Sequence, residues 1–123
     1  MMSILTRNYQ EQVKFSADRF TPVTLAETDR SKVVLACFEP GQFIPVHTPK
    51  VDVMLLVLEG EGTLVAGKKK QRVAPGAVAF AAAGEARGVK ADTRMVILHV
   101  VSPRPAQQDH GEVMSKLQSG NWE

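Results

Sequence analysis

Residues 51–81 read VDVMLLVLEGEGTLVAGKKKQRVAPGAVAFA, and their pattern indicates the fold class. Short apolar runs are separated by turn signals at Gly60-Glu61-Gly62, Gly67-Lys68 and Pro75-Gly76. Glycine favours such turns because it adopts positive φ angles without steric cost. The apolar runs are too short for the three- and four-residue spacing of an amphipathic helix. The stretch therefore predicts successive β-strands joined by tight turns.

The same pattern continues outward, from about Val33 to Val101. Many short strands without intervening helices favour an all-β sandwich or barrel. Before the barrel, the first twenty residues allow either a helical turn near Asn8–Gln12 or a strand near Gln12–Phe15. The predicted strands are Lys32–Phe38, Val51–Leu58, Thr63–Ala66, Gln71–Val73, Ala77–Ala81 and Thr93–Val101.

The C-terminal residues have a helical pattern. Asp109 and Glu112 have the spacing of a capping box, with Asp109 at the N-cap and Glu112 at N3. Apolar side chains then recur on one helical face at Val113, Met114 and Leu117, and Gly120 is suited to a C-cap. We expect a short α-helix at about 109–119 that packs on the barrel.

Length and composition exclude several classes of protein. A chain of 123 residues is expected to form one domain, 1–123. A net charge of +2 is too small to indicate a nucleic-acid surface. The single Cys37 excludes an intramolecular disulfide framework and a Cys-rich zinc site. No apolar run approaches the roughly 20 residues that span a bilayer, and the first residues do not read as a secretory signal. We therefore expect a cytoplasmic protein without nucleic-acid or membrane partners.

Two of the predicted strands are apolar on both faces. Val51–Leu58 and most of Met95–Val101 lack the alternation of a strand with one solvent-exposed side. Their outward face therefore needs a cover. The terminal helix is expected to shield part of it and a second subunit the rest, which predicts a homodimer.

Two segments carry a family resemblance. Pro40-Gly41-Gln42-Phe43-Ile44-Pro45-Val46-His47, continued by Val57-Leu58-Glu59-Gly60-Glu61-Gly62, resembles the first motif of the cupin superfamily. Ala74-Pro75-Gly76, through Ala82-Ala83-Gly84 to Arg87-Gly88-Val89, resembles the second. The resemblance implies a double-stranded β-helix (a jelly-roll, RmlC-like barrel) at about 20–102, with its site inside the barrel. It also implies that dimers are common.

The resemblance breaks at the metal ligands. Typical cupins hold a divalent metal with two histidines and a carboxylate from the first motif and a histidine from the second. Here His47 is retained, whereas the other three positions are Pro49, Val53 and Arg87. One imidazole does not hold a divalent ion, and an arginine cation beside it repels one. We expect neither a metal nor another cofactor.

A metal site built from other residues remains an alternative. His99 shares one strand face with Met95 and Ile97, and if that face points inward it approaches His47. Cys37 or Glu39 is then a conceivable third ligand. The simpler interpretation is that His99 is an ordinary strand histidine and Cys37 a small core residue.

Arg87 has the most chemical content of these departures. If Arg87 keeps the orientation of the metal ligand that it replaces, its guanidinium projects into the barrel. Apolar residues such as Phe43, Val53, Leu55 and Phe80 are expected to line that barrel. A buried cation needs a partner, for which Glu39, an anionic small molecule and solvent at the mouth are the alternatives. The guanidinium fork matches a carboxylate or phosphate. The hypothesis is a small organic anion bound through Arg87 and oriented by His47. The alternative is an arginine at the rim paired with Glu85 or an internal acid.

Three functions follow from these residues. The preferred one is a metal-free cupin that binds a small molecule. The second is a cupin enzyme of the dioxygenase, isomerase or decarboxylase type that uses His47, with no catalytic partner evident in the sequence. The third is an interaction protein that acts through its dimer surface. The predicted ligand-binding residues are His47, Arg87, Phe43, Val53, Leu55 and His99.

Overall fold

The structure is a computed structural model that describes residues 6–103 and 107–123, and for residues 107–110 it describes the backbone alone. These residues form nine strands, a short 3-10 helix at Tyr9–Glu11 and one α-helix. The strands and the α-helix are β1 Thr21–Glu27, β2 Lys32–Phe38, β3 Phe43–His47, β4 Asp52–Glu59, β5 Gly62–Ala66, β6 Lys69–Val73, β7 Val78–Ala81, β8 Arg87–Ala91, β9 Met95–Ser102 and α1 Gln107–Ser119.

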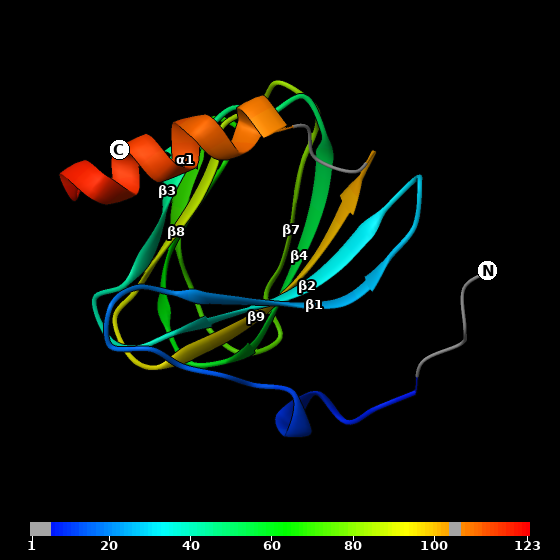
Figure 1. Cartoon of the computed structure of the whole chain (residues 1–123). Helices are drawn as coiled ribbons and strands as arrows, with labels where there is room; N and C mark the ends of the chain where they lie inside the picture. The colour runs from blue at the N-terminus through cyan, green and yellow to red at the C-terminus, as the bar shows by residue number, and fades with distance from the viewer. Residues whose placement is uncertain (1–5, 104–106) are drawn as a thin grey trace.

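The strands form two antiparallel sheets. Their orders are β1-β2-β9-β4-β7 and β3-β8-β5-β6, so strands distant in the sequence become neighbours. The sheets enclose a barrel, and α1 lies across one end of it beside β3 (Figure 1). This arrangement confirms the predicted double-stranded β-helix with a short C-terminal helix.

The turn signals between residues 57 and 77 are confirmed. Gly60 and Gly76 have φ angles of +83° and +95°, which disfavour any other residue. At Gly60 the space is also closed, because an added Cβ would lie 2.8 Å from the Cα of Met95. The glycine therefore allows two chain segments to approach each other at this turn.

Three strands escaped prediction as individual runs. β1 contains Pro22 and a register shift, β3 contains Pro45 and a register shift, and β8 contains Gly88. Each feature interrupts the alternation of apolar and polar residues by which a strand is recognised. Gly88 is required by packing, because a Cβ there would lie 2.8 Å from the Cα of Val46 on β3.

The N-terminal residues cover part of the outer face of the larger sheet. After the 3-10 helix, Val13 and Phe15 pack with Tyr9 on a small outer cluster of buried residues. That cluster consists of Leu35, Cys37 and Val96. The helical turn is thus the correct alternative for this segment, and the strand near Gln12–Phe15 is wrong. The expectation that the terminal helix shields the outer face is also wrong, because α1 packs against β3.

Helix α1 begins two residues earlier than expected and ends as predicted. Asp109 is therefore inside the helix rather than at its N-cap, although its side chain lies outside the described residues. At the other end Gly120 has a φ of +72°, as a C-cap glycine requires. In the part of the chain that the structure describes, no helix is long and apolar enough to cross a membrane.

Candidate functional site

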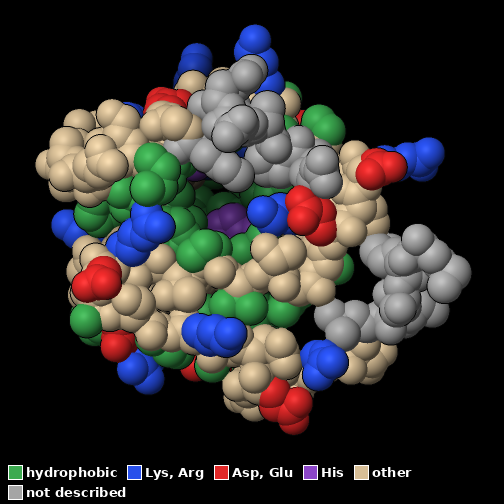
Figure 2. Space-filling view, viewed as in Figure 1, with side chains coloured by type: hydrophobic (Ala, Val, Ile, Leu, Met, Phe, Trp, Pro, Cys, Tyr) green, Lys and Arg blue, Asp and Glu red, His purple; other side chains and the backbone are tan. Residues whose placement is uncertain are grey.

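A cavity of about 390 Å³ opens inside the barrel at the end covered by α1. The other end is filled by core side chains, among them Phe38, Met95 and Ile97. Figure 2 shows a hollow with hydrophobic walls and a histidine on its floor. The described lining residues are Arg19, Phe20, Pro22, Lys32, Val34, Ala36, Ile44, His47, Pro49, Val51, Val53, Leu55, Arg87, Gly88, Val89, His99, Val101, Val113, Met114 and Leu117.

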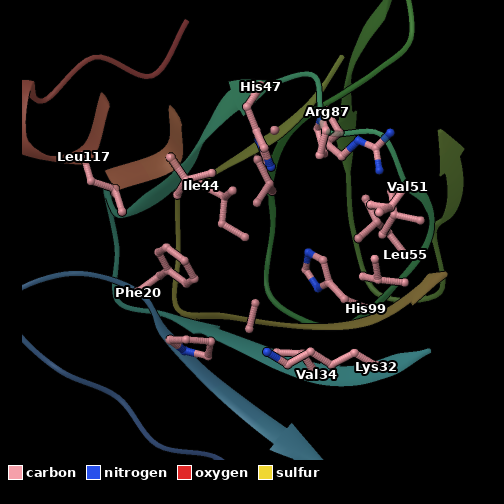
Figure 3. Close-up of a pocket in the computed structure, with 18 of the residues that line it drawn as sticks. Phe20, Lys32, Val34, Ile44, His47, Val51, Leu55, Arg87, His99 and Leu117 are labelled. Carbon is pink, nitrogen blue, oxygen red and sulfur yellow. The ribbon is translucent and has the colours of Figure 1, made fainter. Parts of the chain in front are cut away.

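The four positions that the cupin resemblance assigns to metal ligands all line this cavity. They are His47, Pro49, Val53 and Arg87. His47 at the end of β3 is the register partner of Arg87 at the start of β8. Both residues line the cavity, and the Arg87 guanidinium extends along its wall on the Val51 side (Figure 3). The four positions therefore surround one cavity, and three of them carry side chains that do not donate to a metal.

Arg87 is held by backbone oxygens at the wall. Its Nη2 donates to the oxygen of Ala82 at 2.8 Å and to that of Glu85 at 3.1 Å. Its Nε donates to the same Glu85 oxygen at 3.3 Å. The Glu85 carboxylate instead accepts from the backbone N–H of Ala82. These contacts fix the guanidinium, and Arg87 is only 6% exposed. A permanent cation therefore lies at the wall of an apolar cavity.

His47 is held in one orientation by its own strand. Its Nδ1 lies 2.8 Å from the oxygen of Pro45, and because a carbonyl only accepts, Nδ1 carries the hydrogen. The Nε2 of the neutral ring is then an acceptor. Burial lowers the pKa of His47 below its ordinary value, and the nearby Arg87 cation lowers it further.

His99 approaches this pair from β9. It lies between Val34 on β2 and Leu55 on β4, and its ring points into the cavity (Figure 3). Burial is the main cause that lowers its pKa to about 4, with smaller contributions from His47 and Arg87. At neutral pH both rings are therefore uncharged, and Arg87 supplies the charge beside them.

The donor atoms present do not fit a divalent metal ion. Proline and valine offer no side-chain donor at two of the four expected positions, and arginine offers a cation at a third. Among the side chains of residues 6–103 and 111–123, no three of His, Cys, Asp or Glu are grouped for a metal. The rebuilt site is not formed either. Cys37 faces the outer cluster, and the Glu39 carboxylate accepts from Arg94 Nε at 2.8 Å.

Two aromatic residues lie elsewhere than predicted. Phe43 faces a second hollow beside Asp18 and Gln42, because it precedes Ile44 on β3 and neighbouring strand residues face opposite ways. Phe80 is 60% exposed on β7, where its register partner is Met54. The expectation that these phenylalanines line the barrel is wrong. Val53 and Leu55 line it as predicted.

Sequence reasoning missed the part of the wall farthest from Arg87. Phe20, Ile44 and Leu117 line this side of the cavity (Figure 3). Leu117 was recognised as part of an apolar helix face, but the sequence did not show that this face closes a cavity. Ile44 stands within the first motif, and strand parity was the signal that could have assigned it instead of Phe43.

The charged groups at the cavity share one sign. Its described lining contains Arg19, Lys32 and Arg87, and no aspartate or glutamate is found among those lining residues. Arg87 is the buried cation of the three, since Arg19 is exposed and Lys32 half-buried. Such a lining attracts anions, and its apolar walls strengthen the attraction by excluding water.

Comparison with known proteins agrees with this fold. The Cupin domain family matches residues 34–101, more than half of the sequence, and the chain belongs to this family. No curated protein matches the sequence significantly.

Solved structures give the same result. An RmlC-like cupin protein from Desulfovibrio desulfuricans is 33% identical, with a TM-score of 0.74, and the match covers 82% of this chain and 98% of that one. TT1209 from Thermus thermophilus is 27% identical, with a TM-score of 0.78 and coverage of 81% and 98%. An uncharacterized conserved protein with a double-stranded β-helix domain from Klebsiella pneumoniae is 24% identical, with a TM-score of 0.74 and coverage of 85% and 99%.

Proposed function

We propose that this protein is a metal-free cupin that binds a small organic anion inside its barrel. The position of Arg87 carries the proposal, because this residue places a permanent cation at the wall of an apolar cavity. A guanidinium attracts a carboxylate by its charge, and a low-dielectric surrounding strengthens that attraction. His47 and His99 lie beside the cation, and Val53 and Leu55 contribute apolar wall.

The proposal accounts for the lost metal ligands. In this family the inside of the barrel is kept as a binding site, and here an arginine replaces the ion as the positively charged group. Both charges favour an anionic ligand. They differ chemically, because a guanidinium donates hydrogen bonds and cannot act as a Lewis acid. Binding is therefore better supported than metal-assisted catalysis.

Isothermal titration with a panel of carboxylates and inorganic phosphate tests this function, with wild type compared with Arg87→Met. Methionine has a similar apolar bulk but no charge, so folding is expected to survive. We expect at least one carboxylate to bind wild type and to lose at least tenfold in affinity for the variant. Equal affinity for both proteins, or no binding by any anion, would contradict the proposal.

We further propose that the protein is a homodimer that uses an outer patch of Met54, Leu56, Val78 and Phe80. These residues lie on neighbouring strands, with Met54 paired to Phe80 and Leu56 to Val78. Val78 and Phe80 are 66% and 60% exposed, which is unusual for large apolar side chains grouped on one sheet face. The N-terminal segment covers a different part of this sheet, the outer cluster around Leu35, so a second subunit is the proposed cover for the patch.

The oligomeric state tests the dimer. Light scattering coupled to gel filtration is expected to give twice the chain mass for wild type and the chain mass for Phe80→Lys. Gln71→Lys, on the exposed strand β6 of the other sheet, is the matched control and is expected to remain dimeric. A wild-type monomer would refute the dimer, and a dimeric Phe80→Lys would refute this patch as its interface.

A further inference from the structure

We propose that the ligand is an apolar monocarboxylate, with its carboxylate at Arg87 and its hydrocarbon body against Phe20, Ile44 and Leu117. This inference rests on the proposed anion site and names the class of anion. It follows from the unequal distribution of polar and apolar groups around the cavity.

The buried polar groups of the cavity gather on one side. Arg87 and His47 are register partners, and the pKa of His99 responds to both, so the three side chains lie near one another. Figure 3 shows them on three different strands, with the Arg87 guanidinium extended along the wall on the Val51 side. One anionic group can be held here by the charge of Arg87.

The opposite side of the cavity is apolar. Phe20 is fixed by stacking on Phe38, with ring centroids 5.6 Å apart, and Ile44 joins the same core. Leu117 completes this side from α1 (Figure 3). Phe20, Ile44 and Leu117 themselves offer no polar partner to replace the hydration that a second charged group would lose against them. An apolar body instead gains free energy by leaving water.

The other two cations are poorly placed to select a second carboxylate. Arg19 is exposed and its Nη1 lies 3.1 Å from the Met114 sulfur, while Lys32 is half-buried at the start of β2. Exposed charges act through screened, long-range attraction, so they favour entry of an anion more than they discriminate between anions. The single buried cation of the described lining therefore favours one carboxylate per ligand.

The cavity volume sets the size of the ligand. About 390 Å³ lies near the lower end of the roughly 300–1,000 Å³ range of small-molecule pockets, so the cavity takes a small ligand. Acids with about six to ten carbon atoms meet this limit, whether aliphatic or aromatic. Octanoate represents the aliphatic acids, and 3-phenylpropionate represents the aromatic ones.

A chain-length series tests the inference with the intact protein. Isothermal titration with butanoate, hexanoate and octanoate is expected to show about a three- to fourfold gain in affinity for each added methylene. Hexanamide, which has the same body without the charge, is expected to bind at least tenfold more weakly than hexanoate. Suberate, which adds a second carboxylate at the far end of an eight-carbon chain, is expected to bind at least tenfold more weakly than octanoate.

Two variants locate the hydrocarbon body. Leu117→Ala removes apolar wall contributed by α1 and leaves the barrel core intact, so it is expected to weaken octanoate several-fold and butanoate little. Phe43→Ala is the matched control, because Phe43 neighbours Ile44 on β3 but faces outside the cavity, and both affinities are expected to stay within twofold of wild type.

The outcomes separate this inference from the proposed function. Carboxylate binding that depends on Arg87 but not on chain length would overturn the apolar body and leave the anion site standing. Suberate or phosphate binding more tightly than octanoate would likewise overturn the monocarboxylate. Absence of binding by every anion would overturn both proposals.

Discussion

His47 and Arg87 are register partners on β3 and β8, and both residues line one cavity. Their positions correspond to the first and last metal ligands that the cupin resemblance implies. An imidazole and a guanidinium cannot share a divalent ion, because one donates an electron pair and the other only hydrogen bonds. This pairing therefore does not suit a divalent ion, and it is the basis of the proposed anion site.

Metal removal is predicted to leave the protein unchanged. Pro49, Val53 and Arg87 replace three donors, so extensive dialysis against EDTA is expected to shift the melting temperature by less than about 1 °C. A change of 1 kcal/mol in the unfolding free energy would shift it by at least ~2–4 °C. Elemental analysis before dialysis is expected to find less than about 0.1 metal ion per chain, because one imidazole is too weak a site to retain an ion.

Restoring the donors provides the positive control. The triple variant Pro49→His, Val53→Glu, Arg87→His places three histidines and a carboxylate at the four positions that line the cavity. It is expected to gain stability with added Zn²⁺ or Ni²⁺, by about 2.7 kcal/mol at a metal concentration of 100 times Kd. Stoichiometric metal in wild type would contradict the absence of a metal site.

Carboxylate binding is predicted to strengthen as pH falls from 8 to 6. His47 is neutral in the protein alone, because burial and Arg87 lower its pKa. A bound carboxylate beside the ring favours the charged imidazolium and raises that pKa, so binding takes up protons. Glu112 already acts in this direction on His47, whereas the Arg87 cation acts against it. His99 also faces the cavity and is uncharged in this pH range.

Titration calorimetry of octanoate in two buffers with different ionisation enthalpies measures this proton uptake. His47→Gln keeps a polar side chain of similar reach but does not titrate between pH 8 and 6. We expect the variant to lose most of the pH dependence in that range. A pH-independent wild-type affinity would show that His47 does not contact the anion.

Acid is predicted to destabilise the fold through His99. Its pKa is lowered to about 4 in the folded protein, against about 6.5 in an unfolded chain. Between these values the unfolded chain binds a proton that the folded state does not, so stability is full above pH 6.5 and falls as pH drops towards 4. The loss attributable to His99 is on the order of 3 kcal/mol.

Urea unfolding at pH 7.5, 5.5 and 4.5 measures this loss. In His99→Leu the side chain is apolar at every pH, so the difference in unfolding free energy between pH 7.5 and 4.5 is expected to shrink by most of that amount. His110→Leu is the matched control for loss of a histidine, and its pH dependence is expected to follow wild type. A His99→Leu curve parallel to wild type would contradict the burial of a neutral His99.

The turn at Gly60 is predicted to tolerate no side chain. Gly60→Ala combines positive φ with a Cβ that overlaps the backbone of Arg94 and Met95, so we expect a loss above about 3 kcal/mol or no soluble protein. Gly76→Ala has a similar φ but open space around the Cβ, and a loss of about 1 kcal/mol is expected. Equal losses in chemical unfolding would mean that φ alone, rather than close approach, requires glycine at position 60.

The N-terminal segment is predicted to stabilise the barrel from outside. Phe15 packs on the outer cluster, and the Arg94 guanidinium carbon lies 4.1 Å from its ring centroid. Because Phe15 is half-buried, Phe15→Ala is expected to cost about 2 kcal/mol, below the range for fully buried phenylalanine. Phe15→Leu keeps apolar packing and removes the cation–π contact, so a cost of at most about 1 kcal/mol is expected. Chemical unfolding that gives no loss for Phe15→Ala would show that the segment is not bound there in solution.

Local sequence was sufficient for much of the fold. Lys32–Phe38 forms β2 with the predicted bounds, and the turns at Gly60 and Gly76 lie where the glycines predict them. These features depend on the backbone preferences of single residues and on alternation within one strand. Proline, glycine or a register shift breaks that alternation in β1, β3 and β8, which explains why these strands were not predicted individually.

The candidate site, like the fold, could be predicted only in part from local sequence. Residue types at four spaced positions indicated that His47 is retained and that Arg87 stands where a ligand is expected, and chemistry alone then argues against a metal. The inward or outward direction of a side chain reverses with a one-residue change of register. This is why Phe43 and Phe80 were assigned to the cavity, which Ile44 and Phe20 line instead.

The barrel, its turns and the donor atoms at the site could be inferred from the amino-acid sequence alone, because each follows from local conformational preference or from the chemistry of one side chain. Three other features required the folded chain. They are the identity of the apolar side chains that face the cavity, the closure of its far wall by α1, and the covering of the outer cluster by residues 9–15. These features depend on contacts between segments far apart in the chain, and such contacts are fixed by the packing of the whole barrel.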